Sequence, residues 1–180
     1  MVNDRNKKRR VVVVVVPPVE ELDLVGPMQV FSAANRLAGK DVYALEIATS
    51  KDELKVEGEG GMLSFLAQHR LREVNGSIDS VLLVCGVATR LLKDRALSQW
   101  LANVAPGVRR LGGVCVASFL LAEAGLLKGK RATTHWKFGK ELTKRFPQTL
   151  VETEPIWVRD GNIYTSARDL CRNRSRAGVG

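Results

Sequence analysis

The sequence predicts an α/β protein in which a mostly parallel, doubly wound sheet carries helices on both faces. A run of valines at residues 11–16 has no polar alternation, which is typical of a central strand buried on both sides. Apolar strand-like runs then alternate along the chain with segments of helical spacing. Sheets of this kind bind their ligands outside the carboxyl ends of the strands, so the strand-to-helix loops are the places to search for a site.

The elements follow in order. The first strand leads into a predicted loop over residues 19–26 and a helix over 27–39, with Pro27 suited to the first turn and Gly39 past the end. Residues 42–48, 81–84 and 114–116 predict further strands. Apolar residues at helical spacing predict helices within 91–104 and 136–146. Two apolar runs, 156–158 and 163–165, flank the turn-forming residues 159–162 and predict a hairpin.

The composition predicts one globular domain. The chain has 180 residues, of which 45% are hydrophobic and 26% are charged. No window approaches the roughly 18 consecutive apolar residues of a membrane span, and residues 11–16 are too short for a signal-peptide core, so we expect a cytoplasmic protein with no membrane contact. Three widely spaced cysteines and two histidines give neither a disulfide framework nor a metal-ligand pattern, and no cofactor is implied.

The net charge of +9 is concentrated at the two ends of the chain. Five cations lie within residues 1–10 and four within residues 168–180, whereas the body between them is close to neutral. No helix-turn-helix, zinc-finger or RNA-recognition signature occurs in the sequence. We therefore expect residues 1–10 to be a flexible basic tail, and both basic ends to be solvated rather than to form a nucleic-acid surface.

Cys115 lies where a glycine-containing strand meets an apolar helical segment, which is typical of a nucleophile elbow. The sharp turn needs small residues two positions before and after the cysteine, and Gly113 and Ala117 supply them. Such an elbow is expected to present Cys115 to solvent, and the following helix start favours a thiolate. The alternative is an inert cysteine buried at a strand end.

Other candidate residues lie at the same predicted edge of the sheet. His135 is the candidate base for a thiol, although it also fits a surface histidine at a helix start. Asp23 lies in an apolar setting and can hydrogen-bond a cysteine or act as an acid or base, or simply stabilise a helix N-terminus. Gly86 and Val87 form a turn whose backbone N–H groups can approach a substrate oxygen. His69 lies in a polar stretch and is expected to be solvated.

These motifs together resemble the DJ-1/PfpI superfamily, and within it the amidase-like (class I glutamine amidotransferase-like) N-terminal domain of AraC-type transcriptional regulators. The resemblance covers about residues 11–167. It is carried by Leu22-Asp23-Leu24-Val25-Gly26-Pro27, by the elbow at Cys115 with Ala124-Gly125-Leu126-Leu127 after it, by Arg131-Ala132-Thr133-Thr134-His135-Trp136, and by Tyr164-Thr165-Ser166-Ala167.

The resemblance implies a flavodoxin-like sandwich, usually a homodimer, with Cys115 as nucleophile, His135 near it and Asp23 as its acidic neighbour. The backbone N–H of Val116 is a further candidate oxyanion donor beside those of Gly86 and Val87. Two departures stand out. Cys85-Gly86-Val87 replaces the usual Pro-Gly-Gly type turn, and Val116 replaces the threonine that follows the cysteine in the isocyanide hydratases of the superfamily.

The end of the chain departs further. Resembling domains continue after Ser166-Ala167 with an apolar helix of the type Gly-Ile-Ser-Ala-Gly-Ile-Asp-Leu-Ala-Leu-Ala-Leu, but residues 168–180 are arginine-rich. One permitted coding of these residues, read with its first base dropped, translates into that helix. We expect residues 168–180 to be a frameshifted end, which removed the last helix and any DNA-binding domain beyond it.

Three functions are compatible with these residues. The first is a small-molecule-sensing, effector-binding domain of an AraC-type regulator, with DNA contacted only through a domain absent from this chain. The second is a cysteine-dependent hydrolase, amidase or hydratase that acts on a small substrate through Cys115. The third is a redox-responsive protein in which Cys115 is oxidised. The sequence favours the first, because the motifs are most similar to those of the regulator branch.

Overall fold

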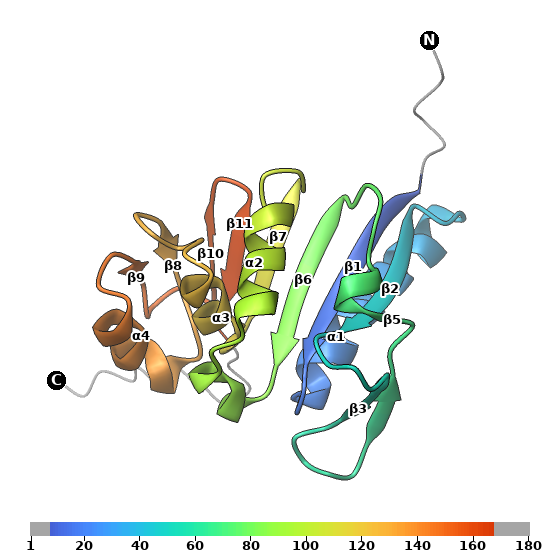
Figure 1. The fold of residues 1–180 in the computed structure, drawn as a ribbon. Helices are drawn as coiled ribbons and strands as arrows, with labels where there is room; N and C mark the ends of the chain where they lie inside the picture. The colour runs from blue at the N-terminus through green and yellow to red at the C-terminus, as the bar shows by residue number, and fades with distance from the viewer. Residues whose placement is uncertain (1–7, 168–180) are drawn as a thin grey trace, which may run out of the picture.

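The computed structural model describes residues 8–167, and it has a seven-stranded sheet at its centre (Figure 1). The strand order is β10-β11-β7-β6-β1-β2-β5, and every pairing is parallel except that of β10 with β11. The predicted parallel α/β architecture is therefore correct. The strands are β1 (Arg9–Val16), β2 (Tyr43–Thr49), β5 (His69–Arg70), β6 (Ser80–Cys85), β7 (Arg110–Val114), β10 (Trp157–Asp160) and β11 (Ile163–Ser166).

Two small sheets accompany the central one. An antiparallel pair is formed by β3 (Lys55–Glu57) and β4 (Ser64–Leu66), and a parallel pair by β8 (Arg131–Ala132) and β9 (Leu150–Val151). The predicted frameshifted end, residues 168–180, and most of the predicted basic tail lie outside the described residues. None of the helices within residues 8–167 combines the length and the apolar character that crossing a bilayer requires.

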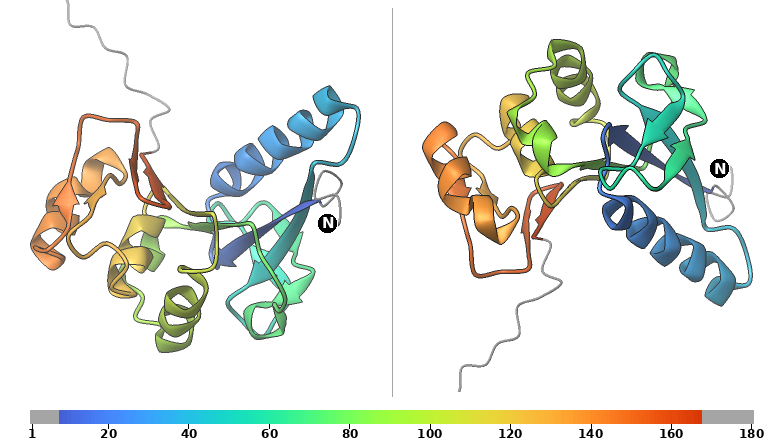
Figure 2. Two further views of the ribbon diagram at one scale, coloured as in Figure 1. Left: turned by 90° about the horizontal axis from the view of Figure 1, so that it is seen from above. Right: turned by 90° about the horizontal axis from the view of Figure 1, so that it is seen from below.

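Helices cover both faces of the sheet, as a doubly wound fold requires. Figure 2 shows α1 (Glu21–Ala38) on one side, and α2 (Arg95–Val104) and α3 (Ala117–Glu123) on the other. The valines of β1 are all buried and alternate between these sides: Val12 and Val14 belong to the core beneath α2 and α3, and Val13 and Val15 to the core beneath α1. The remaining helical segments are α4 (Gly139–Arg145) and the 3-10 turns η2 (Leu71–Glu73), η3 (Val87–Leu91) and η4 (Trp136–Phe138).

The first helix begins six residues earlier than predicted. Residues 21–26 were expected to form a loop, but they are the first turns of α1, and Pro27 lies inside the helix. A proline lacks the N–H that would bond the carbonyl of Asp23, and Gly26-Pro27 is a weak helix sequence. Tertiary packing outweighs these preferences, since Leu24 is buried against the valine core. Asp23 therefore lies on the helix and not in a loop before it.

Three other boundaries differ from the sequence prediction. The apolar run over residues 91–104 is split into η3 and α2, because Asp94 caps α2 by accepting the Leu97 N–H at 2.9 Å. The 136–146 segment is η4 followed by α4, and the strand expected at 114–116 ends at Val114. The predicted hairpin is correct: β10 and β11 pair antiparallel around Gly161, whose φ of 63° suits glycine.

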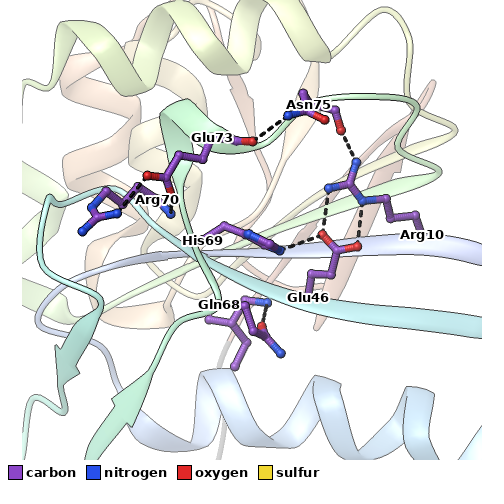
Figure 3. Close-up of polar contacts among 8 residues, drawn as sticks. Arg10, Glu46, Gln68, His69, Arg70, Glu73 and Asn75 are labelled. Carbon is purple, nitrogen blue, oxygen red and sulfur yellow. Dashed lines mark hydrogen bonds and ion pairs between the residues drawn. The ribbon is translucent and has the colours of Figure 1, made fainter.

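A polar network joins β1, β2 and β5 (Figure 3). The Arg10 guanidinium donates to both carboxylate oxygens of Glu46, at 2.8 and 2.7 Å, and His69 Nε2 lies 3.5 Å from Glu46 Oε2. The tail boundary predicted at residue 10 is therefore wrong by two residues, because β1 already pairs from Arg9. The expectation that His69 is merely solvated is also wrong.

Candidate functional site

Cys115 lies in the turn between β7 and α3 and has a left-handed backbone, with φ 57°. This conformation is uncommon for a residue other than glycine. Its N–H donates to the Ser166 carbonyl at 2.8 Å, and its carbonyl accepts the hydroxyls of Ser118 and Thr134, each at 3.2 Å. These three hydrogen bonds hold the strained turn, and they tie it to β11 and to the segment before η4.

Gly113 makes the close approach of strand and helix at this turn possible. A Cβ at this position would lie 2.8 Å from Leu121 Cδ1 and 3.4 Å from backbone atoms of Ala117 and Ser118. A side chain here would therefore have to displace the buried Leu121 side chain of α3. The need for a small residue two positions before the cysteine has a direct steric cause in this structure.

The Cys115 side chain is buried, with 2% of the residue exposed, and this corrects the expectation that the turn presents it to solvent. Its pKa is raised, first by burial and then by the negative charge of Asp23. A hydrogen bond with the Val116 N–H lowers the pKa of Cys115, but this effect is weaker than those of burial and of the Asp23 charge. The helix start favours a thiolate through the Val116 N–H, as expected, but the loss of water around the sulfur outweighs it.

Asp23 is the acidic neighbour of this thiol. It occupies the first turn of α1 and is 5% exposed. Side-chain hydrogen bonding to Asp23 raises the pKa of Cys115, as expected where a thiol donates to a carboxylate. The structure thus brings together two of the residues singled out in the sequence, and it does so through a helix that begins earlier than predicted.

Cys85 is a second buried thiol at this place, and sequence reasoning treated it only as part of a turn. It ends β6, the strand between β1 and β7, and pairs with Val16. Burial raises the pKa of Cys85 to about 12; a hydrogen bond with Thr89 lowers it, and the charges of Asp23 and Glu59 raise it further. The sequence signal was available, because one strand of the parallel sheet ends at a cysteine and the next is followed directly by one.

The predicted donor loop is occupied by groups from within the chain. The Gly86 N–H donates to the Pro18 carbonyl at 2.7 Å, and the Val87 N–H donates to Glu59 Oε2 at 2.9 Å. The Ala88 N–H reaches the other Glu59 oxygen at 3.3 Å. Glu59 comes from the loop between β3 and β4 and was not a sequence candidate. A carboxylate of the protein therefore lies where an oxyanion was expected to be received.

His135 precedes η4, and its Nδ1 accepts the Lys137 N–H at 3.2 Å. The imidazole stacks on Trp136, with ring centroids 5.5 Å apart, and lies 5.3 Å from the Phe138 ring. The adjacent residue, Thr134, makes the contact with the Cys115 carbonyl. His135 is thus joined to the elbow through its chain neighbour, and its role as a base stays a prediction.

A flavodoxin-like sheet with a cysteine in a strained strand-to-helix turn and an acid beside the thiol defines a class of α/β proteins. Within that class, this chain belongs to the DJ-1/PfpI family, whose family model matches residues 9–171.

Relatives in this family include regulators and an enzyme. The chain is 27% identical over 146 residues to the HTH-type transcriptional regulator GbdR of Pseudomonas aeruginosa, covering 81% of this chain and 39% of the regulator. It is 30% identical over 152 residues to the isonitrile hydratase of Pseudomonas putida, covering 83% and 60%. The chain thus spans less than two thirds of either relative. A crystal structure of an AraC family regulator from Pseudomonas putida shares the fold, with a TM-score of 0.72, 24% identity, and 88% and 83% coverage.

Proposed function

We propose that this chain is a small-molecule-sensing, effector-binding domain of an AraC-type transcriptional regulator. The observation that carries the proposal is the burial of Cys115, 2% exposed, in a chain homologous to part of a transcriptional regulator, since burial raises the pKa of the thiol and favours its neutral form. A neutral thiol is a poor nucleophile, so the environment favours binding over covalent catalysis. Contact with DNA belongs, in this proposal, to a further domain of the full regulator.

The proposal is tested by screening small metabolites for thermal stabilisation of the wild type and of Cys115→Ser. A ligand that binds only the folded state raises Tm by mass action. We expect stabilisation by at least one metabolite class, retained in Cys115→Ser, with no chemical change of that metabolite. Turnover that is abolished by Cys115→Ser would overturn the proposal.

A cysteine-dependent enzyme is the second candidate. It is favoured by the 30% identity to an isonitrile hydratase and by the hydrogen bonding between Asp23 and the Cys115 thiol. In this second candidate function, Asp23 accepts the proton of the Cys115 thiol when the substrate binds. Val116 offers only its N–H to the reaction, because it has no hydroxyl. Incubation with an isonitrile, followed by detection of the N-formamide, distinguishes this candidate from the first.

We also propose that the domain is cytoplasmic and forms a homodimer through α1. The outward side of this helix carries exposed apolar residues, among them Val30 and Leu37, which are 67% and 89% exposed. Exposed apolar patches are typical of protein interfaces. Light scattering on the wild type and on Val30→Glu tests this: we expect a dimer that the substitution dissociates, and a monomeric wild type would overturn the proposal.

A further inference from the structure

A pocket of about 310 Å³ lies apart from Cys115, beyond the carboxyl end of β2. Its walls come from the residues after β2, from the segment running from β5 into η2, and from α2. These walls lie on the side of the sheet away from α1 (Figure 2). The volume is at the lower end of the range of small-molecule sites, and the carboxyl edge of a doubly wound sheet is their usual position.

The floor of the pocket is apolar. Leu71 and Leu97 are buried there, and Trp100 is half-buried, so that part of its indole faces the pocket. An aromatic ring beside two leucines offers a surface on which a flat or branched apolar group packs well. Sequence reasoning treated Leu97 and Trp100 only as core residues of a helix.

The rim of the pocket carries cations. Arg70 is held by Glu73, at 2.8 Å, and by the Asp52 carbonyl, and Arg72 is paired with Asp52. Each guanidinium keeps further N–H donors beyond those bonds. Lys51, also in the lining, forms no ion pair with any residue in the described part of the chain. The rim therefore has an unbalanced positive charge and fixed donors.

We propose that this pocket binds a small carboxylate with an aromatic or branched aliphatic body. The apolar body packs on Trp100 and the two leucines, and the carboxylate takes hydrogen bonds from the arginines of the rim and the charge of Lys51. The assignment deepens the proposed sensor function and rests on it, since it gives the effector a chemical class and a place.

The test is titration calorimetry of the full chain with phenylacetate and isovalerate, and with phenylacetamide as the neutral analogue. We expect the carboxylates to bind, and phenylacetate to bind about tenfold more tightly than the amide, as charge-assisted hydrogen bonds predict. Lys51→Gln is the first variant, because Lys51 holds no other residue in place, and we expect it to weaken phenylacetate binding about tenfold and leave amide binding unchanged.

Two controls separate this assignment from its alternatives. Lys140→Gln removes an equal charge from the exposed face of α4 and is expected to leave binding unchanged. Cys115→Ser is also expected to leave it unchanged, so that the failure of a cysteine-based function and the failure of this pocket give different results. The assignment is overturned if no carboxylate binds with Kd below about 10 mM, if the amide binds equally well, if Lys140→Gln weakens binding as much as Lys51→Gln, or if Cys115→Ser abolishes it.

Discussion

The two buried thiols make a defined prediction about alkaline stability. The pKa values of Cys85 and Cys115 are both raised from an ordinary value of 9.0, and burial is the main cause for each. A group whose pKa is raised by folding contributes stability that is fully present below the unfolded pKa and is lost as pH rises toward the folded pKa. The domain is therefore expected to lose stability above pH 9, where unfolded thiols ionise and folded ones do not.

The size of this loss follows from the pKa of the unfolded thiol. One pH unit above that pKa, each thiol lowers the free energy of unfolding by about 1.4 kcal/mol, and the pair by roughly 3 kcal/mol. Cys85→Ala removes one of the two contributions. Whatever its stability at neutral pH, this variant is expected to lose about 1.4 kcal/mol less than the wild type between about pH 7 and pH 10.

The assay is urea denaturation followed by circular dichroism, at neutral and alkaline pH under reducing conditions. Each protein is compared with itself across pH, so the lysine and tyrosine titrations common to all variants cancel. Cys115→Ala is expected to behave as Cys85→Ala does. Parallel pH profiles for the wild type and both variants would mean that both thiols ionise in the folded state as they do in the unfolded chain, contrary to this prediction.

Other substitutions test individual contacts. Glu59→Ala removes the acceptor of two loop N–H groups and is expected to cost about 1–2 kcal/mol and to speed amide exchange in that loop; unchanged exchange would contradict the contact. Gly113→Ala places a Cβ 2.8 Å from Leu121 and is expected to cost about 1–3 kcal/mol in calorimetry. Gly107→Ala, whose Cβ would meet its nearest atom at 3.7 Å, is the matched control and is expected to change stability by less than about 0.5 kcal/mol, so equal effects would argue against the steric account. Asp94→Ala removes the cap of α2 and is expected to lower Tm by about 2–4 °C, with most of the loss recovered in Asp94→Asn.

Much of the fold was predictable from the sequence, because its strongest signals are local. The valines at 11–16 place apolar side chains on both faces of a strand, so both faces must be buried. They form β1, the strand between β2 and β6. The hairpin at Gly161 was predictable for the same reason, since its turn residues and flanking strands are adjacent in sequence. The start of α1 was not, because Gly26-Pro27 is locally unfavourable for a helix and only packing of Leu24 on distant strands compensates.

The sequence identified residues of the candidate site, but it did not predict their burial or their contacts with distant segments. Cys115 and Asp23 were identified from their neighbours in sequence, and the structure brings them together. The burial of Cys115 depends on contacts with segments far away along the chain, which no local pattern encodes. Glu59 was missed for this reason: it bonds the Val87 N–H across 28 residues, and its own sequence context resembles an ordinary polar loop.

We propose that this domain binds a small molecule and does not use Cys115 as a nucleophile. The most direct test is the pH dependence of Cys115 alkylation in the intact protein, with the modified cysteine identified by peptide mass spectrometry. We expect slow alkylation that keeps rising with pH to beyond the ordinary thiol pKa of 9.0. An alkylation midpoint well below that value would rule out this proposal and identify Cys115 as an activated nucleophile.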